Sequence, residues 1–166
     1  MKTLATDLDG TLYLDDVLIK GVESAYKSLI LDNYKIFHTT NNSSQSTDVL
    51  AKKLSNLLNV DIDLSSIVTP LVVLKEYLSN KKLSIFVYGS NDVKDFISSI
   101  SNTVTKLEDS NFIIMGRVES PSESELDLIA ESIKSRKEGA TLNKDLTYPI
   151  SESEFKPGNG QIAKYI

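Results

Sequence analysis

Two aspartates stand two residues apart near the start of the chain, in the run DLDGTL at residues 7–12. They follow residues 2–6, which have the character of a short buried strand that ends at a glycine turn. Residues i and i+2 of a strand point to the same side, so Asp7 and Asp9 can face one site while Leu8 points back to the core. Such a pair supplies hard oxygen ligands for Mg²⁺, or one nucleophile and one general acid/base. These aspartates are therefore the first candidates for catalysis.

Two simpler explanations of the aspartates are a calcium loop and a polar turn. A calcium loop counted from Asp7 requires glycine at its sixth position and glutamate at its twelfth, where this chain has Leu12 and Leu18. A polar turn without chemistry is the other alternative, because clustered aspartates often cap and turn chains. Two carboxylates directly after a buried strand repel each other unless a cation is present, which favours the catalytic interpretation.

The run DLDGT at residues 7–11 resembles the first motif of the haloacid dehalogenase superfamily of phosphatases. Its second motif is a serine or threonine at the end of the next core strand, and Thr40 in the run IFHTTNNSS at residues 36–44 fits it. The TNNSS form is similar to the branch of NagD-like, para-nitrophenyl, pyridoxal, phosphoglycolate and ribonucleotide-monophosphate phosphatases. The resemblance covers essentially the whole chain. Landmarks similar to those of the large α/β cap of that branch, and of the re-entry into the core, occur at residues 87–90, 112–116, 139–145 and 157–160.

The resemblance implies a Mg²⁺-dependent phosphomonoester hydrolase that acts on a small phosphorylated metabolite. Asp7 would attack phosphorus to form an aspartyl-phosphate, and Asp9 would serve as general acid and then as general base. Mg²⁺ would be bound by Asp7 and Asp9. Thr40 and Asn41 would bind the phosphate, although these residue types also favour helix N-caps.

Other polar residues carry weaker signals. Asn143 and Asp145 fall in a loop that resembles the substrate-contacting loop of the cap, and a simple turn after a strand is an equal alternative. His38 lies within an expected strand, where a structural role is favoured, and Tyr13 either lines the site or packs in the core. Residues 158–160 read as a turn, because the run lacks the features of a phosphate-binding loop.

The elements that position these residues alternate between strand and helix, which predicts an α/β fold with a parallel sheet flanked by helices. By the resemblance, residues 1–79 form a Rossmann-like core that lacks some of its strands. Residues 80–148 form an inserted α/β cap, and residues 149–166 begin the return to the core. Strands are expected at residues 2–6, 34–39, 66–69, 83–88, 103–107, 111–116 and 140–142, and helices at residues 21–31, 47–58, 70–78, 92–100, 122–137 and 161–166.

Two motifs of the superfamily are missing from the chain, the third-motif lysine and the fourth-motif acidic pair. Lys164 lacks the Gly-Lys-Pro context of the former and is not expected to be the catalytic lysine. The sequence is therefore expected to be the N-terminal part of a longer protein, with little or no activity by itself. The alternative of a different class is a catalytically incomplete or degenerate phosphate- or Mg²⁺-binding module, or a subunit completed in trans.

Composition limits the remaining function classes. The 166 residues are 40% hydrophobic and 25% charged, with a formal charge of −5, which is typical of a globular protein. The lack of cysteine and the single histidine exclude disulfides, thiolate nucleophiles and multi-histidine metal sites. The acidic balance argues against a nucleic-acid partner, and no apolar run approaches the ~20 residues of a membrane span. We expect a cytoplasmic protein, and homo-oligomerisation is left open.

Overall fold

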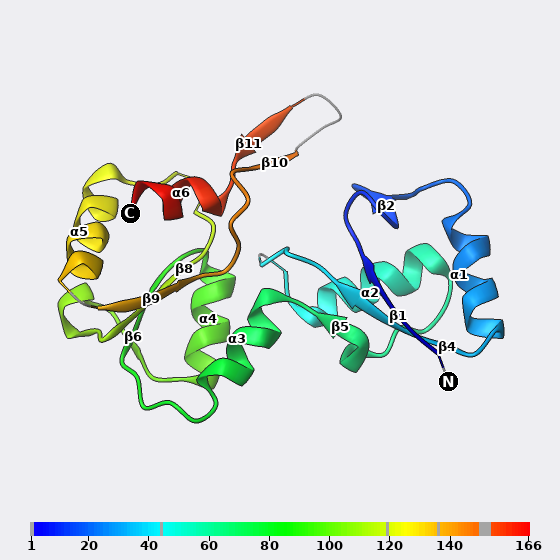
Figure 1. The fold of residues 1–166 in the computed structure, drawn as a ribbon, viewed down its shortest axis with the longest axis horizontal. Helices are drawn as coiled ribbons and strands as arrows, with labels where there is room; N and C mark the ends of the chain where they lie inside the picture. The colour runs from blue at the N-terminus through cyan, green and yellow to red at the C-terminus, as the bar shows by residue number, and fades with distance from the viewer. Residues whose placement is uncertain (1, 44, 119, 136, 150–153) are drawn as a thin grey trace. The chain divides into compact units, whose positions relative to one another are not determined.

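A computed structural model describes residues 2–43, 45–118, 120–135, 137–149 and 154–166. The chain divides into two compact units, Met1–Thr69 and Pro70–Ile166. Each unit has its own parallel sheet, flanked by helices, and its own hydrophobic core (Figure 1). The predicted α/β fold class is therefore confirmed.

The first unit is built on a three-stranded parallel sheet with the order β1-β4-β5. The first two strands pair from Lys2 opposite Tyr34 to Asp7 opposite Thr39, so both end at the same edge of the sheet. An antiparallel hairpin that the sequence did not predict follows the first strand. The strands are β1 (Lys2–Asp7), β4 (Tyr34–Thr39) and β5 (Ile67–Val68), and those of the hairpin are β2 (Tyr13–Leu14) and β3 (Val17–Leu18).

Two α-helices complete the first unit, α1 (Val22–Leu31) and α2 (Thr47–Leu58). Ser46 caps the second helix, since its hydroxyl accepts a hydrogen bond from the backbone N–H of Val49 at 3.4 Å. The apolar face of α2 joins the core together with Leu8, the residue between the two aspartates. Burial of Leu8 fixes the direction of the chain as it leaves the first strand. The buried residues of α2 are Leu50, Ala51, Leu54 and Leu58.

The second unit contains a four-stranded parallel sheet with the order β7-β6-β8-β9. The strand at residues 112–115 is the most apolar and is fully buried, as expected for a parallel strand that is covered on both faces. The strands are β6 (Ile85–Tyr88), β7 (Thr103–Val104), β8 (Phe112–Met115) and β9 (Glu138–Thr141), and a separate antiparallel hairpin is formed by β10 (Thr147–Pro149) and β11 (Phe155–Pro157). The helices are α3 (Pro70–Leu78), α4 (Asn91–Ile100), α5 (Glu123–Lys134) and α6 (Asn159–Tyr165).

Packing assigns helices α3 and α6 to the second unit. The apolar face of α3 shares a core cluster with Ile85 and Ile97, and Ile162 of α6 packs with Tyr88 and Ile113. The observed division after Thr69 therefore lies one helix before the expected boundary at residue 79. Residues 159–165 also pack within the second unit, whereas they were expected to begin a return to the core. The identification of the two units as core and cap stays a prediction.

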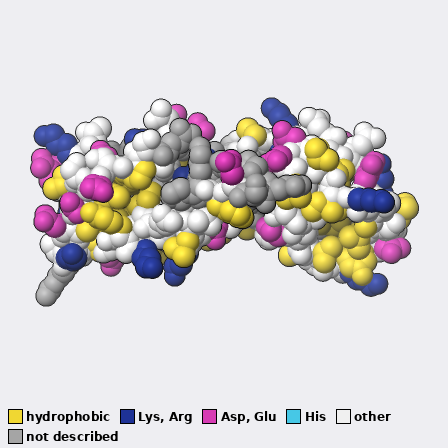
Figure 2. All heavy atoms as spheres, turned by 90° about the horizontal axis from the view of Figure 1, so that it is seen from above, with side chains coloured by type: hydrophobic (Ala, Val, Ile, Leu, Met, Phe, Trp, Pro, Cys, Tyr) yellow, Lys and Arg dark blue, Asp and Glu magenta, His cyan; other side chains and the backbone are white. Residues whose placement is uncertain are grey.

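On the face shown in Figure 2, acidic and basic side chains are interspersed, with apolar side chains between them. Within the described ranges, none of the helices combines the length and hydropathy that crossing a membrane requires.

Candidate active site

The carboxyl end of β1 presents both aspartates to solvent. Asp7 is the last residue of the strand, and the buried Leu8 separates it from Asp9. The carbonyl oxygen of Leu8 accepts hydrogen bonds from the backbone N–H groups of Thr11 at 3.2 Å and Leu12 at 2.9 Å, which closes a tight turn. Gly10 adopts a φ of +79° within that turn, a backbone conformation that L side chains rarely adopt. Folding of this short run thus brings both carboxylates to the edge of the sheet.

Thr40 follows the neighbouring strand β4 and faces the aspartates. Its hydroxyl donates a long hydrogen bond of 3.5 Å to Oδ2 of Asp9 and accepts one of 3.0 Å from the backbone N–H of Asn42. Its own backbone N–H donates to the carbonyl of Val68 at 3.1 Å, which anchors the loop to β5. The structure therefore brings Thr40 and Asp9 together, and it exposes Asn41 in the same loop. Ser44, at the end of the TNNSS motif, lies outside the described residues.

Helix α2 tests the alternative interpretation, in which Thr40 and Asn41 are helix caps. The observed N-cap of α2 is Ser46, several residues further along the chain. The hydroxyl of Thr40 instead points to the carboxylate of Asp9. A capping role therefore does not account for the position of Thr40.

The sequence did not indicate that Lys53 of α2 lies beside this site. Its Nζ is 4.2 Å from the centroid of the Tyr13 ring and 2.9 Å from Oδ1 of Asp16, and it also donates to the carbonyl oxygen of Asp15. Asp15 lies at the tip of the β2–β3 hairpin with a φ of +51°. Lys53 thus ties the hairpin to the helix. No local signal marked Lys53, because a lysine at the border of the apolar face of an amphipathic helix is ordinary.

The charges at the site perturb one another. Partial burial raises the pKa of Asp9 above its ordinary value, Lys53 lowers it, the charge of Asp7 raises it, and the Thr40 hydrogen bond lowers it. Tyr13 is almost completely buried, with 1% of its surface exposed. Burial, the negative charges of Asp9 and Asp7, and a hydrogen bond to Asp9 together raise the pKa of Tyr13 strongly. Tyr13 therefore remains a neutral phenol that donates to Asp9, and a raised pKa suits Asp9 to general acid/base work.

The aspartates were also predicted to hold Mg²⁺. Among the residues that the structure describes, no three or more His, Cys, Asp or Glu side chains converge on a metal-sized site. Mg²⁺ in proteins is often held by one or two carboxylates and keeps several of its waters. The solvent-exposed pair of Asp7 and Asp9 fits that mode of binding, because its neighbouring negative charges would be balanced by the cation.

The predicted substrate residues of the cap lie in the second unit, in the loop after β9. The backbone N–H of Asp145 donates to Oδ1 of Asn143 at 3.3 Å. Such a bond is typical of a simple turn, which was the alternative to a substrate-contacting loop. The carbonyl oxygen of Asn143 accepts from Thr141 at 2.8 Å and from Nδ2 of the buried Asn159 at 3.4 Å. These hydrogen bonds hold the loop against Asn159, and its role in binding substrate stays a prediction.

The glycines expected to form a turn instead begin helix α6 against that loop. The backbone N–H groups of Gly158 and Gly160 donate to the carbonyls of Leu146 and Asp145, both at 2.8 Å. A side chain at Gly160 would overlap the backbone carbonyl of Lys144, so glycine is needed for this close approach.

His38 is a structural residue, as predicted, with 1% of its surface exposed. Its Nε2 lies 2.9 Å from the hydroxyl of Tyr26, and its Nδ1 lies 3.0 Å from the hydroxyl of Ser66. Burial lowers the pKa of His38 below its ordinary value of 6.5. The imidazole is therefore a neutral link between α1 and the end of the sheet.

Comparisons with known proteins identify the family of the chain. A family model of haloacid dehalogenase-like hydrolases matches residues 4–101. The chain is 28% identical over 164 residues to an acid sugar phosphatase from Staphylococcus haemolyticus, covering 96% of this chain and 61% of that protein. It is 22% identical to an acid sugar phosphatase from Staphylococcus aureus, over 99% of this chain and 64% of that protein. The chain thus spans about three fifths of the length of the curated relatives it matches.

Solved structures resemble the whole chain. A 4-nitrophenylphosphatase from Thermotoga maritima is similar with a TM-score of 0.84 and 25% identity, covering 99% of this chain and 63% of that one. A glycerol phosphate phosphatase from Mycobacterium tuberculosis in complex with magnesium has a TM-score of 0.82 and 22% identity, covering 99% of this chain and 51% of that one. At 22% identity, the likeness to the glycerol phosphate phosphatase shows a shared fold alone.

Proposed function

Because the chain belongs to the haloacid dehalogenase-like hydrolases, we propose that it carries the nucleophile of a phosphatase. The substrate would be a phosphomonoester of a small metabolite. A sugar phosphate is the first class to test, since the curated relatives are acid sugar phosphatases. The observation that carries the proposal is the hydrogen bond between Thr40 and Asp9 at the carboxyl ends of two adjacent parallel strands, where ligands of open α/β sheets bind.

The chemistry would be divided between the two aspartates. Asp7 is solvent-exposed, so its carboxylate can attack the phosphorus atom and form an aspartyl-phosphate as the alcohol leaves. Asp9 would give its proton to the leaving oxygen, and then take a proton from the water that hydrolyses the aspartyl-phosphate. The hydrogen bond from Tyr13 would orient the Asp9 carboxyl for both transfers.

The phosphoryl oxygens would be held by Thr40, which reaches Asp9 and already sits at the end of β4, and by Asn41 beside it. Mg²⁺, when bound by Asp7 and Asp9, would reduce the repulsion between the attacking carboxylate and the phosphate. Asn143 and Asp145 stay the candidates for substrate specificity, because their loop resembles the substrate-contacting loop of the family's cap.

The first experiment is a Mg²⁺-dependent hydrolysis assay with p-nitrophenyl phosphate and a panel of sugar phosphates. It uses the 166-residue chain and the longest protein that its reading frame encodes. We expect the 166-residue chain to be the slower of the two, because no third carboxylate or histidine of the described residues joins Asp7 and Asp9. Equal rates would contradict that expectation. They would also oppose the alternative of a module that must be completed in trans.

The test of the nucleophile is Asp7→Asn in whichever protein hydrolyses phosphate esters. The amide cannot attack phosphorus, so we expect the rate to fall by at least about a thousandfold. Asp61→Asn, an exposed aspartate elsewhere in the first unit, is the matched control. Near-normal turnover by the Asp7→Asn protein would remove the nucleophile assignment.

A further inference from the structure

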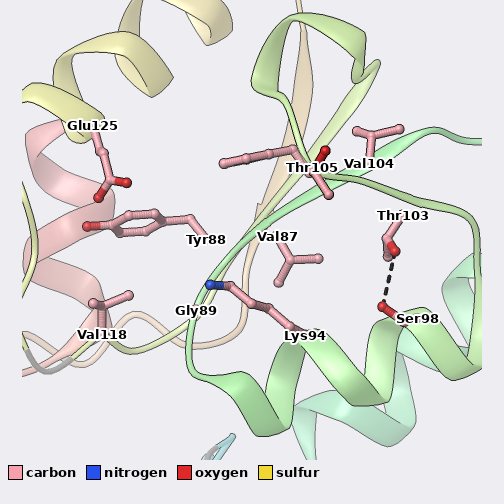
Figure 3. Close-up of a pocket in the computed structure, with 11 residues that line it drawn as sticks. Val87, Tyr88, Gly89, Lys94, Ser98, Thr103, Val104, Thr105, Val118 and Glu125 are labelled. Carbon is pink, nitrogen blue, oxygen red and sulfur yellow. Dashed lines mark hydrogen bonds between the residues drawn. The ribbon is translucent and has the colours of Figure 1, made fainter.

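The second unit contains a cavity of about 450 Å³ at the carboxyl end of β6 (Figure 3). Val87, Tyr88 and Gly89 line it from this strand and the residue after it, and Thr105 is the residue that follows β7. All of the residues that line the cavity therefore belong to the second unit.

The strand order makes this end of the sheet a place where a ligand is expected. β6 comes first in the sequence but lies inside the sheet, with β7 on one side and β8 on the other. The chain thus leaves β6 towards one neighbour and later returns to the opposite side. In open parallel sheets, the crevice at such a switch point is where ligands bind. The observed cavity lies at the carboxyl end of β6, and Val118 and Glu125 line it from the segment after β8.

Two opposite charges flank the cavity. Lys94, in the first turns of α4, extends its amine into the cavity, and Glu125, in the first turn of α5, presents its carboxylate beside the ring of Tyr88 (Figure 3). The ion pairs of the described residues include neither Lys94 nor Glu125. The cavity therefore offers one cationic and one anionic group, and no ion pair among the described residues neutralises either of them.

The rest of the lining is apolar or carries hydroxyl groups. Val87 and Val104 are apolar side chains at the ends of two adjacent strands. The hydroxyls of Ser98 and Thr103 lie 3.0 Å apart, and only one of the two protons is needed for the bond between them. One O–H group thus remains available to a ligand.

We propose that this cavity binds a zwitterionic metabolite of the α-amino acid class that has an apolar side chain. The ligand carboxylate would pair with Lys94, its ammonium group with Glu125, and its side chain would lie against Val87 and Val104. A simple anion would be repelled by Glu125 and a simple amine by Lys94, whereas a zwitterion satisfies both charges. The volume of the cavity accommodates a side chain as well as the two charged groups.

The test is a titration of the whole 166-residue chain, followed by two-dimensional amide NMR. The probes are L-leucine and L-phenylalanine, with isocaproate and isoamylamine as analogues of leucine that lack the amino group or the carboxylate. We expect saturable shifts at the amides of Gly89 and Thr105, and binding of each analogue at least about tenfold weaker than leucine. Absence of saturable shifts, or equal affinity for the analogues, would overturn the proposal.

The variants Lys94→Gln and Glu125→Gln keep the size of the side chains and remove one charge each. Both are expected to weaken leucine binding by at least about tenfold. Lys134→Gln and Glu131→Gln, on exposed positions of α5 outside the cavity, serve as controls. Unchanged affinity in the Lys94→Gln or Glu125→Gln protein, with a dispersed amide spectrum that shows intact folding, would also refute the proposal. Binding is read directly, so the result is independent of whether Asp7 is a nucleophile.

Discussion

The polar groups at the strand ends of the first unit come from two short runs of sequence, whereas those of the second unit come from separate helices. Asp7 and Asp9 follow β1 directly, and Thr40 follows β4. The cavity of the second unit instead receives Lys94 from α4 and Glu125 from α5. Both units use the carboxyl edge of a parallel sheet, but among the described residues only the first unit places two closely spaced aspartates directly after a strand. This difference is the reason for proposing reaction chemistry in the first unit and ligand binding in the second.

The strongest test of this comparison is Asp9→Asn, in a protein that hydrolyses phosphate esters. The amide keeps the shape of the side chain but cannot transfer a proton, so we expect turnover to fall by about 10²- to 10⁴-fold while phosphate still binds. Steady-state kinetics and phosphate inhibition measure the two effects separately. Asp95→Asn on α4 is the matched change in the second unit and is expected to leave turnover unaltered. A comparable loss from both variants would break the comparison.

Thr40 allows a finer division between binding and chemistry. Thr40→Val removes the hydroxyl that reaches Asp9 and would hold a phosphoryl oxygen, so we expect kcat/KM to fall by about tenfold to a hundredfold. Thr40→Ser keeps the hydroxyl and is the control, with activity close to that of the unmodified protein. If valine and serine at this position give the same rate, Thr40 has no part in binding phosphate.

The contrast between the units also explains how much of the molecule could be predicted from its sequence. Two features were recognisable because the residues that define each of them are contiguous in the sequence. They are the strand with its aspartates at residues 2–9 and the apolar strand at residues 112–115. The hairpin at residues 13–18 was missed because each of its strands has only two residues, too few to show an alternating pattern.

Features assembled from distant segments left no local signal. Lys53 meets Tyr13 and the hairpin only after α2 has packed, and the cavity of the second unit draws on residues from 86 to 125. The packing of α3 with the second unit depends on which sheet receives Leu71, Leu74 and Leu78, and an apolar helical face does not specify its partner. These assignments require tertiary contacts, which a single sequence does not show.

Lys53 provides a smaller but more specific effect in the first unit. The cation lowers the pKa of Asp9, so Lys53→Met should raise that pKa and shift the limb of the pH–rate profile that reports Asp9 to higher pH. At a fixed pH near neutrality we expect a change in kcat/KM of roughly threefold to fivefold, typical of a partly exposed charge. Lys53→Arg should restore the profile, and Lys52→Met, an exposed neighbour, should not move it. A profile for Lys53→Met that overlays that of the unmodified protein would show that Lys53 supports only the hairpin.

The smallest expected effect concerns stability and arises from His38, which lies in the strand just before Thr40. The Ser66 hydroxyl donates to the carbonyl oxygen of Asp63 at 2.6 Å, so it must accept from Nδ1–H of His38. Nε2 is then the nitrogen that accepts from the hydroxyl of Tyr26. A second proton on the imidazole would point at that donor within the core, which is why the folded chain resists protonation and burial lowers the pKa of His38.

The sign of the pH dependence follows from that lowered pKa. The unfolded chain binds the proton near the ordinary pKa of about 6.5, whereas the folded chain does not, so the free energy of unfolding should fall as pH drops below that value. Above it, both states are neutral at this residue and no contribution is expected. Urea denaturation on either side of about pH 6.5 measures the change, and the difference from His38→Gln isolates the contribution of this residue from that of the carboxylates. A difference between the two proteins that stays constant across this pH range would mean that His38 is protonated as readily in the folded chain as in the unfolded one, and the neutral link between α1 and the sheet would have to be abandoned.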